Sequence, residues 1–186
     1  EMEANKIETL LNCRYDKHLA RFFLWNQIPS LTLMLLGLAL AGYITGIWWP
    51  LISLALGAVA LWGFGVETRL LCSHCPFYAG EGKTLHCLAL DGFPKLWKYR
   101  PGPMTRLEKI LLSALAIYLE AMPVAFQVYG VWYLWFHRLG RPAILGMALI
   151  MLATVLTEWQ FVYVIQHDFC ARCVNFSCPL NRVPKE

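Results

Sequence analysis

The chain has 186 residues, a formal net charge of +4 at pH 7 and a hydrophobic content of 58%. Soluble domains are typically about 45–50% apolar, and the excess here is gathered into four long apolar runs. This distribution excludes an ordinary water-soluble globule. Because the basic residues flank these runs and form no cluster of their own, nothing indicates nucleic-acid binding. We predict an all-α integral membrane protein with four transmembrane helices.

Residues 1–21, before the first apolar run, are charged and amphipathic. No small-residue cleavage site follows that run, so we interpret the run as a retained helix and not as a secretory signal peptide. We expect residues 1–21 to form a cytoplasmic segment. Cys13 lies alone in this segment and is interpreted as a tolerated small apolar residue.

The first two transmembrane helices are predicted within residues 22–66, at about 22–43 and 46–66, with an uncharged link between them. Each run is close to the ~20 residues that a helix needs to cross a bilayer core. Nothing in hydrocarbon satisfies the backbone of an open strand, so these runs are expected to be helices. Pro29 removes one backbone hydrogen bond and is expected to bend the first helix.

Residues 67–106 form a predicted cytoplasmic loop that opens with the first cysteine motif. The motif is Cys-Ser-His-Cys-Pro, with a third cysteine a short polar stretch further on. The cysteines of this group and the histidines beside them, which could add nitrogen ligands, are Cys72, Cys75, Cys87, His74 and His86.

The rest of this loop is rich in glycine, proline and aromatic residues, which predicts an ordered loop with turns and not a second domain. Its segment 95–100, Lys-Leu-Trp-Lys-Tyr-Arg, mixes basic and aromatic side chains. We interpret this segment as an interfacial anchor to anionic lipid. The alternative is a docking patch for an acidic partner or for the phosphate of a ligand.

The third and fourth transmembrane helices are predicted within residues 107–166, at about 107–136 and 142–165. Pro123 is expected to bend the third helix. Pro142 lies at the start of the fourth, where a missing N–H costs little.

Two carboxylates, Glu120 and Glu158, lie near the middle of these helices. A charge at that depth costs at least about 2.5 kcal/mol, so both are candidate proton or ligand groups: a proton path, a quinone site or ion coordination. Gln127 shares a helix face with Glu120. The alternative interpretation is that both carboxyl groups are protonated and hydrogen-bonded between helices. No Glu-x-x-His pair is present, which argues against a di-iron bundle.

The tail, residues 167–186, carries the second cysteine motif immediately after the fourth helix. Its motif is Cys-Ala-Arg-Cys, followed by a further Cys-Pro. The residues of this group that could bind a metal are Cys170, Cys173, Cys178 and the neighbouring His167.

The distribution of Lys and Arg predicts which side of the membrane each segment occupies. Most basic residues lie in the N-terminal segment, the central loop and the tail, whereas Arg138 and Arg141 belong to the opposite face. Positive charge stays in the cytoplasm. We therefore expect both termini and both cysteine motifs on the cytoplasmic side, in a bacterial or archaeal cytoplasmic membrane.

Both motifs follow helices that end at the same predicted surface, so we expect their cysteines to converge on a metal centre. An iron–sulfur cluster is favoured, since both motifs contain the Cys-Pro ending of bacterial cluster motifs. Zinc is the alternative, with Cys72, Cys75, Cys170 and Cys173 completing one tetrahedral site or six thiolates holding two ions. A redox-active dithiol is the weakest option, because no strand pattern of a thioredoxin-like unit is present.

Three functions follow from this centre. The first is an electron-transfer subunit of a membrane redox system, acting with a protein partner or as a homo-oligomer, with a quinone as a further ligand. The second is a non-enzymatic scaffold or assembly protein with a structural zinc site. The third is a metal transporter or chaperone, which is disfavoured because carboxylates suit hard cations better than thiophilic ones.

Overall fold

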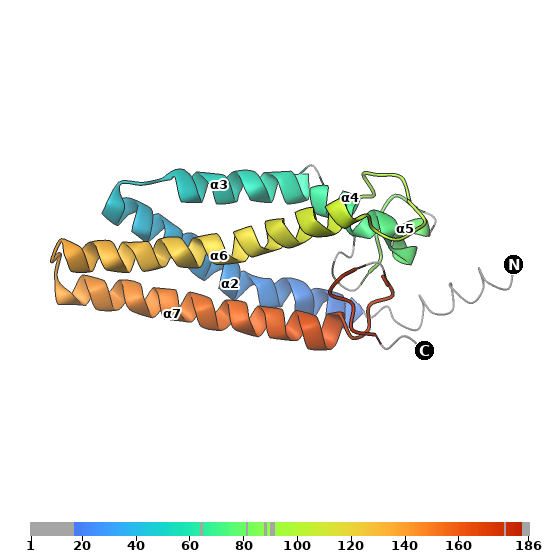
Figure 1. Ribbon diagram of the computed structural model, residues 1–186. Coiled ribbons are helices and arrows are strands. Elements are labelled where there is room, and N and C mark those ends of the chain that lie inside the picture. Colours follow the sequence, from blue (N-terminus) through green and yellow to red (C-terminus); the bar gives the residue numbers. More distant parts are fainter. Residues whose placement is uncertain are drawn as a thin grey trace, which may run out of the picture. The chain divides into compact units, whose positions relative to one another are not determined.

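The computed structural model describes residues 17–63, 65–80, 82–87, 89, 92–176 and 178–183. Over these residues the chain is helical, apart from turns and one isolated antiparallel bridge between Thr84 and Pro94 (Figure 1). The all-α prediction is confirmed for this part of the chain. The predicted N-terminal segment up to residue 16, with Cys13, lies outside the described residues.

Three helices are long and apolar enough to cross a membrane, and a bent pair of shorter helices makes up to four. The helices in chain order are α2 (Lys17–Thr45), α3 (Trp49–Ala58), α4 (Val66–Leu70), α5 (Pro76–Ala79), α6 (Arg106–Phe136) and α7 (Arg141–Val164). A π-helical turn, Val59–Gly63, extends α3, and another, Ile165–Phe169, extends α7. The candidate spans therefore match the four predicted runs closely in position. Pro29 and Pro123 each lie inside one continuous helix.

The second predicted span is not the single straight helix that the sequence suggested for residues 46–66. The segments Trp49–Leu61 and Val66–His74 pass the length and hydropathy test only together, and they are bent by 49° at the break between them. Gly65 has φ = +62°, a left-handed conformation that glycine adopts without steric cost. A left-handed residue cannot continue a right-handed helix, so the helix direction changes here.

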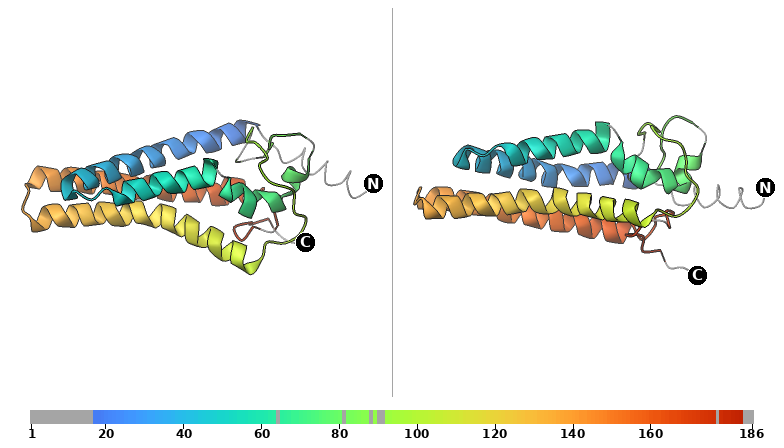
Figure 2. Two further views of the ribbon diagram at one scale, coloured as in Figure 1. Left: turned by 90° about the horizontal axis from the view of Figure 1, so that it is seen from above. Right: turned by 45° about the horizontal axis from the view of Figure 1, so that its top comes forward.

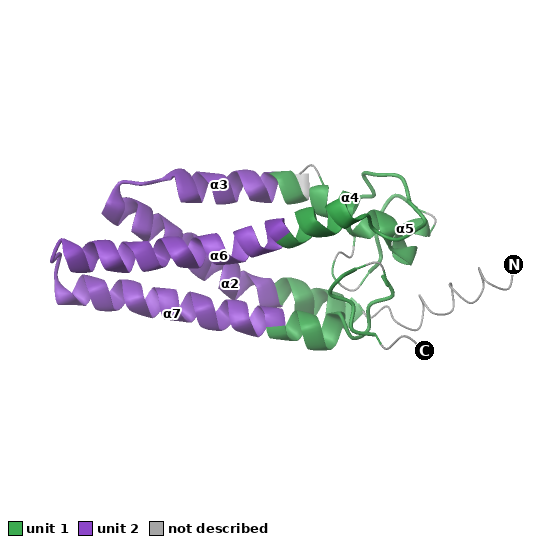
Figure 3. Ribbon diagram, in the orientation of Figure 1, with its two compact units in different colours: residues 1–25, 60–113, 163–186 green, residues 26–59, 114–162 purple. Residues whose placement is uncertain are grey.

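The chain divides into two compact units (Figure 3). Unit 1 comprises Glu1–Trp25, Ala60–Ser113 and Tyr163–Glu186, and unit 2 comprises Asn26–Val59 and Ala114–Val162. Unit 1 thus includes both cysteine motifs, and unit 2 includes the middle parts of the long helices.

Unit 2 is held together by close packing of small and apolar side chains. Its helix segments from α6 and α7 run alongside each other (Figure 2), and its core contains Leu38, Ala41, Leu54, Phe126, Leu134 and Met147. A Cβ atom at Gly37 would lie 2.3 Å from the Gln127 side chain, and one at Gly130 would lie 3.1 Å from the Ala41 Cβ. Small residues four apart on α2 therefore let α6 approach closely, as is common between membrane helices.

The interior of unit 1 contains several polar side chains, which bond to backbone carbonyls. Thr68, Ser73, His74 and Asn175 are all buried. Thr68 Oγ1 donates to the Gly65 carbonyl at 2.8 Å, and Ser73 Oγ donates to the Arg69 carbonyl. Side-chain to backbone bonds thus hold together a region that has few regular elements.

Candidate cysteine-rich metal centre

The first cysteine motif lies on a sharp turn between two short helices. A single 3₁₀ turn, Cys72–His74, follows α4, and the Cys75 N–H donates to the Cys72 carbonyl at 2.9 Å. Cys75 is extended (φ −87°, ψ 138°) and Pro76 begins α5, where a missing N–H leaves no bond unmade. The sequence Cys-Ser-His-Cys-Pro therefore encodes a tight turn with a thiol at each end.

The second motif leaves α7 through the π-helical turn Ile165–Phe169 and continues as irregular chain. Asn181 fixes its shape, because its Nδ2 donates to the carbonyls of Cys173 at 2.8 Å and Asn175 at 2.9 Å. Asn175 Nδ2 in turn donates to the Leu71 carbonyl at 3.0 Å. This last bond joins the second motif to the residue immediately before Cys72.

Within unit 1 the structure brings thiols of both motifs close enough for their charges to interact. Cys72 interacts with Cys87, Cys75 and Cys173. Cys75 interacts with Cys173, Cys87 and Cys178. Sulfur atoms from three separate segments of the chain therefore share one neighbourhood.

The surroundings of Cys170 differ from those of Cys72 and Cys75. Its thiol interacts with Cys178 and Cys173 of its own segment and with Arg182. Cys87 interacts with Cys72 and Cys75, whereas Cys170 interacts with Cys173 and Cys178. The choice of Cys72, Cys75, Cys170 and Cys173 for a single zinc ion stays a prediction.

Burial makes these thiols hard to ionise when no cation is present. It raises the pKa of Cys75 far above the ordinary value, and neighbouring cysteines add to the shift. Burial also raises the pKa of Cys178, and that of Cys170 to about 11. A thiolate is the metal-binding form of cysteine. A bound cation would supply the positive charge that ionisation of this group requires.

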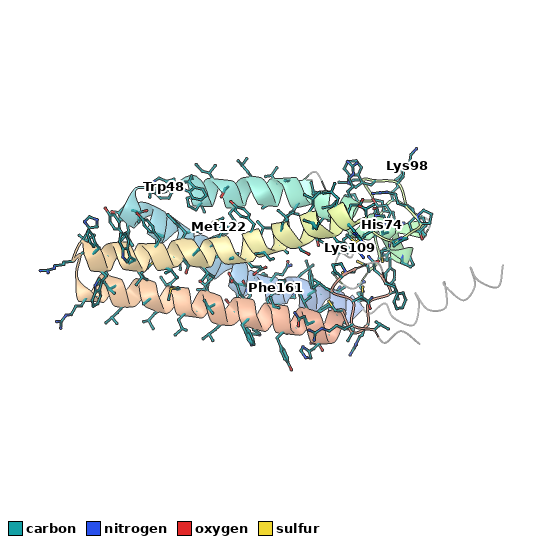
Figure 4. The ribbon with its side chains drawn as sticks, viewed as in Figure 1. Trp48, His74, Lys98, Lys109, Met122 and Phe161 are labelled. Carbon is teal, nitrogen blue, oxygen red and sulfur yellow. The ribbon has the colours of Figure 1, made fainter. Side chains whose placement is uncertain are left out.

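The three candidate histidines have different surroundings. His74 is buried, its Nδ1 donates to the Gly102 carbonyl at 2.9 Å, and its Nε2 lies 3.6 Å from Glu108 Oε2 (Figure 4). His86 lies 3.5 Å from the Thr84 hydroxyl and is exposed. His167 Nδ1 lies 2.9 Å from the Tyr163 carbonyl, and its ring stacks on Tyr163. His74 thus fixes the loop against the first turn of α6.

No disulfide bond joins the described cysteines, which are Cys72, Cys75, Cys87, Cys170, Cys173 and Cys178. Among the described residues, no three or more His, Cys, Asp or Glu side chains already stand in a metal-binding arrangement.

Sequence reasoning missed the residues that assemble the site. Asn175 and Asn181 connect and shape the second motif, and the Arg100 N–H donates to the Ser73 carbonyl at 2.8 Å. Glu67 interacts with both Cys72 and Cys178. The asparagines flanking the motif were a usable signal, since asparagine side chains commonly satisfy the backbone of irregular turns.

The polar residues predicted inside the membrane helices form a second group, in unit 2. Gln127 and Thr154 are fully buried, and the Thr154 hydroxyl donates to Gln127 Oε1 at 3.1 Å, linking α6 to α7. Glu158 is 8% exposed, one of its carboxyl oxygens has no hydrogen-bond partner among the described residues, and it interacts electrostatically with Glu120. Thr157 bonds to the carbonyls of Ala153 and Thr154.

The chain matches no protein-family model, and no curated protein sequence or solved structure is significantly similar to it.

Proposed function

We propose that this chain is an integral membrane protein whose helices α2, α6 and α7 and bent pair α3–α4 cross the bilayer. The support is the length and apolar character of these helices. The distribution of Lys and Arg favours a cytoplasmic location for both cysteine motifs.

The cysteines of unit 1 bind a metal centre, for which we favour an iron–sulfur cluster in an electron-transfer subunit. The observation that supports this most is the interaction of Cys72 and Cys75 with Cys87 and Cys173. Four thiolates complete an iron–sulfur cluster, and this set supplies four. We assign Cys178 as a ligand that could replace one of these four, and we leave Cys170 outside the ligand set.

A cluster held by Cys72, Cys75, Cys87 and Cys173 would supply one-electron redox chemistry between a reduced partner and an acceptor. If the acceptor is a membrane quinone, two such electrons and two protons give the quinol. Glu158 and Glu120 are the groups we assign to supply or receive those protons, because Glu158 is buried with an unpartnered carboxyl oxygen.

Anaerobic purification followed by elemental analysis and visible absorption spectroscopy tests the metal centre. The expected result is stoichiometric iron and sulfide with broad visible absorption. Cys75→Ser and Cys87→Ser should lose most of the iron, Cys170→Ser should keep most of it, and Cys13→Ser serves as the control. A metal-free wild-type protein, or equal iron in all four variants, would contradict the proposal.

A structural zinc site is the second candidate, and a separate observation favours it. The site already joins segments that are distant in sequence through the bond from Asn175 to the Leu71 carbonyl. A zinc ion holding the same thiolates would clamp the same segments as part of a scaffold, with no redox role. A colourless protein with stoichiometric zinc would establish this alternative.

The proton role is tested separately from the metal. Glu158→Gln keeps the size and hydrogen-bonding capacity of the side chain but removes its acidity. The variant should keep the full metal content yet lose quinol-dependent reduction of the cluster. Thr157→Val, one residue away, is the matched control. Unchanged reduction in Glu158→Gln would remove this carboxyl group from the proposed pathway.

A further inference from the structure

The segment Lys95–Arg100 of unit 1 is fixed in place by its backbone. The Lys95 N–H donates to the Lys83 carbonyl at 2.8 Å, the Trp97 N–H to the Tyr78 hydroxyl at 2.7 Å, and the Arg100 N–H to the Ser73 carbonyl at 2.8 Å. Its side chains therefore occupy defined positions.

Several apolar side chains of this fixed segment remain uncovered. Leu96 is 46% exposed, and Trp97 and Tyr99 are each 38% exposed. Lys98 is exposed and points away from the rest of unit 1 (Figure 4). A surface that combines exposed aromatic and basic groups is suited to the headgroup region of a bilayer, where rings sit among lipid carbonyls and amines reach phosphates.

Charge favours an anionic partner. Residues 67–106 contain six basic and three acidic residues. The Arg69 guanidinium lies 4.8 Å from the centre of the Trp97 ring. Arg69 therefore adds a positive charge beside this exposed indole, in addition to that of Lys98. Arg100 is paired with Glu108 at 2.6 Å. The other cations on the segment or beside the Trp97 ring are Lys95, whose ammonium also donates to the Gly80 carbonyl, Lys98 and Arg69.

The position of Trp97 on the chain favours lipid over a soluble acidic protein. Its Nε1 donates to the Gly65 carbonyl at 2.9 Å, and a Cβ atom at Gly65 would lie 2.7 Å from Leu96. Gly65 is the residue at which the bent candidate span changes direction. The aromatic and basic segment therefore lies against the span itself, at the end of its apolar part.

From these contacts we infer that Arg69, Lys95, Trp97 and Lys98 form a surface that binds the headgroups of anionic phospholipids. This inference rests on the proposed membrane insertion. The amines and the guanidinium bind the lipid phosphate, while Leu96 and the exposed rings lie among the upper acyl chains.

Native mass spectrometry of the full chain, released from detergent with equimolar phosphatidylglycerol and phosphatidylcholine, tests this inference. The wild type should retain phosphatidylglycerol preferentially. Lys98→Glu, at a fully external side chain, should lower that preference by at least about fivefold, since each basic residue near the surface contributes on the order of 1 kcal/mol. Lys95→Ala/Lys98→Ala lowers the charge by the same two units and should lower the preference to a similar degree. Lys95→Arg/Lys98→Arg, which keeps both positive charges, is the matched control and should leave it unchanged.

Each contrary result has a distinct meaning. Equal retention of both lipids by the wild type, or an unchanged preference in both charge-lowering variants, overturns the inference. Displacement of phosphatidylglycerol by a poly-glutamate peptide at equal charge concentration would instead assign the surface to an acidic protein. Alkaline carbonate extraction of the membranes tests insertion independently: a chain that washes off contradicts the proposed function, whereas one that stays without lipid preference contradicts this inference alone.

Discussion

The two units of this chain are stabilised in different ways. In unit 2 the side chains of Leu38, Ala41 and Phe126 form an apolar core around closely approaching helices. In unit 1 the buried set includes Ser73, His74 and Asn175, which bond to backbone carbonyls around a group of thiols. Unit 2 is held together by close packing of apolar helix faces, whereas unit 1 depends on hydrogen bonds between irregular segments. A bound metal would hold together the separate segments of unit 1 and would have little effect on unit 2.

The largest expected effect follows removal of the metal that we propose for unit 1. Removal of the centre with a strong chelator under anaerobic conditions should leave four or more buried thiols without a compensating cation. We expect amide hydrogen exchange to accelerate strongly in residues 71–79 and 170–181, because the segments lose their common anchor. Exchange in residues 122–134 of α6 should change little. Equal acceleration of exchange in both regions would contradict the claim that the metal stabilises unit 1 alone.

The next effect concerns Asn175. Asn175→Ala removes the side-chain donor to the part-buried Leu71 carbonyl, which keeps only the 3.4 Å bond from the His74 N–H, and should cost about 1 kcal/mol of local stability. The measurement is the rate of alkylation of Cys75 and Cys173 in the metal-free protein, which should rise as the turn opens. Arg172→Ala, an exposed neighbour, is the control. Identical alkylation rates in the two variants would show that the bond does not close the site.

In unit 2, a single substitution should lower stability by disturbing the packing between helices. Gly37→Ala places a Cβ atom 2.3 Å from the Gln127 side chain, so the helices must separate or Gln127 must shift, at a cost of about 1–3 kcal/mol. Gly146→Ala is the matched control, because nothing lies within 4 Å of its Cβ position. Thermal unfolding in detergent should show a lowered midpoint for the first variant only, with the metal content of both unchanged.

The smallest effect is expected for the polar link in unit 2. Thr154→Val removes the hydroxyl that donates to Gln127 Oε1 but keeps the branched shape of the side chain. Hydrogen bonds between membrane helices contribute about 0.6 kcal/mol on average. The unfolding midpoint should therefore fall only slightly, and Thr157→Val should give a similar or smaller change. A loss as large as that of Gly37→Ala would make the polar link, not close packing, the main support of unit 2.

The positions of the long helices could be read from the sequence because each depends on a local property. An apolar run of sufficient length predicts a span wherever it occurs, and α2, α6 and α7 lie where the runs predicted them. The break at Gly65 was missed. The sequence stays apolar through Val59–Gly63, so hydropathy alone predicts an unbroken helix. The signals for a change of direction are the glycines at 63 and 65.

The assembly of the cysteine site could be predicted only in part. The two Cys-x-x-Cys motifs predicted which thiols could bind a metal, and the helix ends predicted that both motifs lie at the same surface. The contact that joins them, from Asn175 to Leu71, spans 104 residues and has no local signature. The place of Cys87 beside Cys72 likewise depends on the path of the loop, which Trp97 and Tyr78 fix by hydrogen bonds.

Metal K-edge X-ray absorption of the anaerobically purified chain examines the coordination of the cysteines most directly. A metal held by Cys72, Cys75, Cys87 and Cys173 predicts a first shell made of sulfur alone, at about 2.3 Å, with an additional iron–iron shell if the centre is a cluster. A first shell of nitrogen and oxygen, or no bound metal at all, would contradict the account.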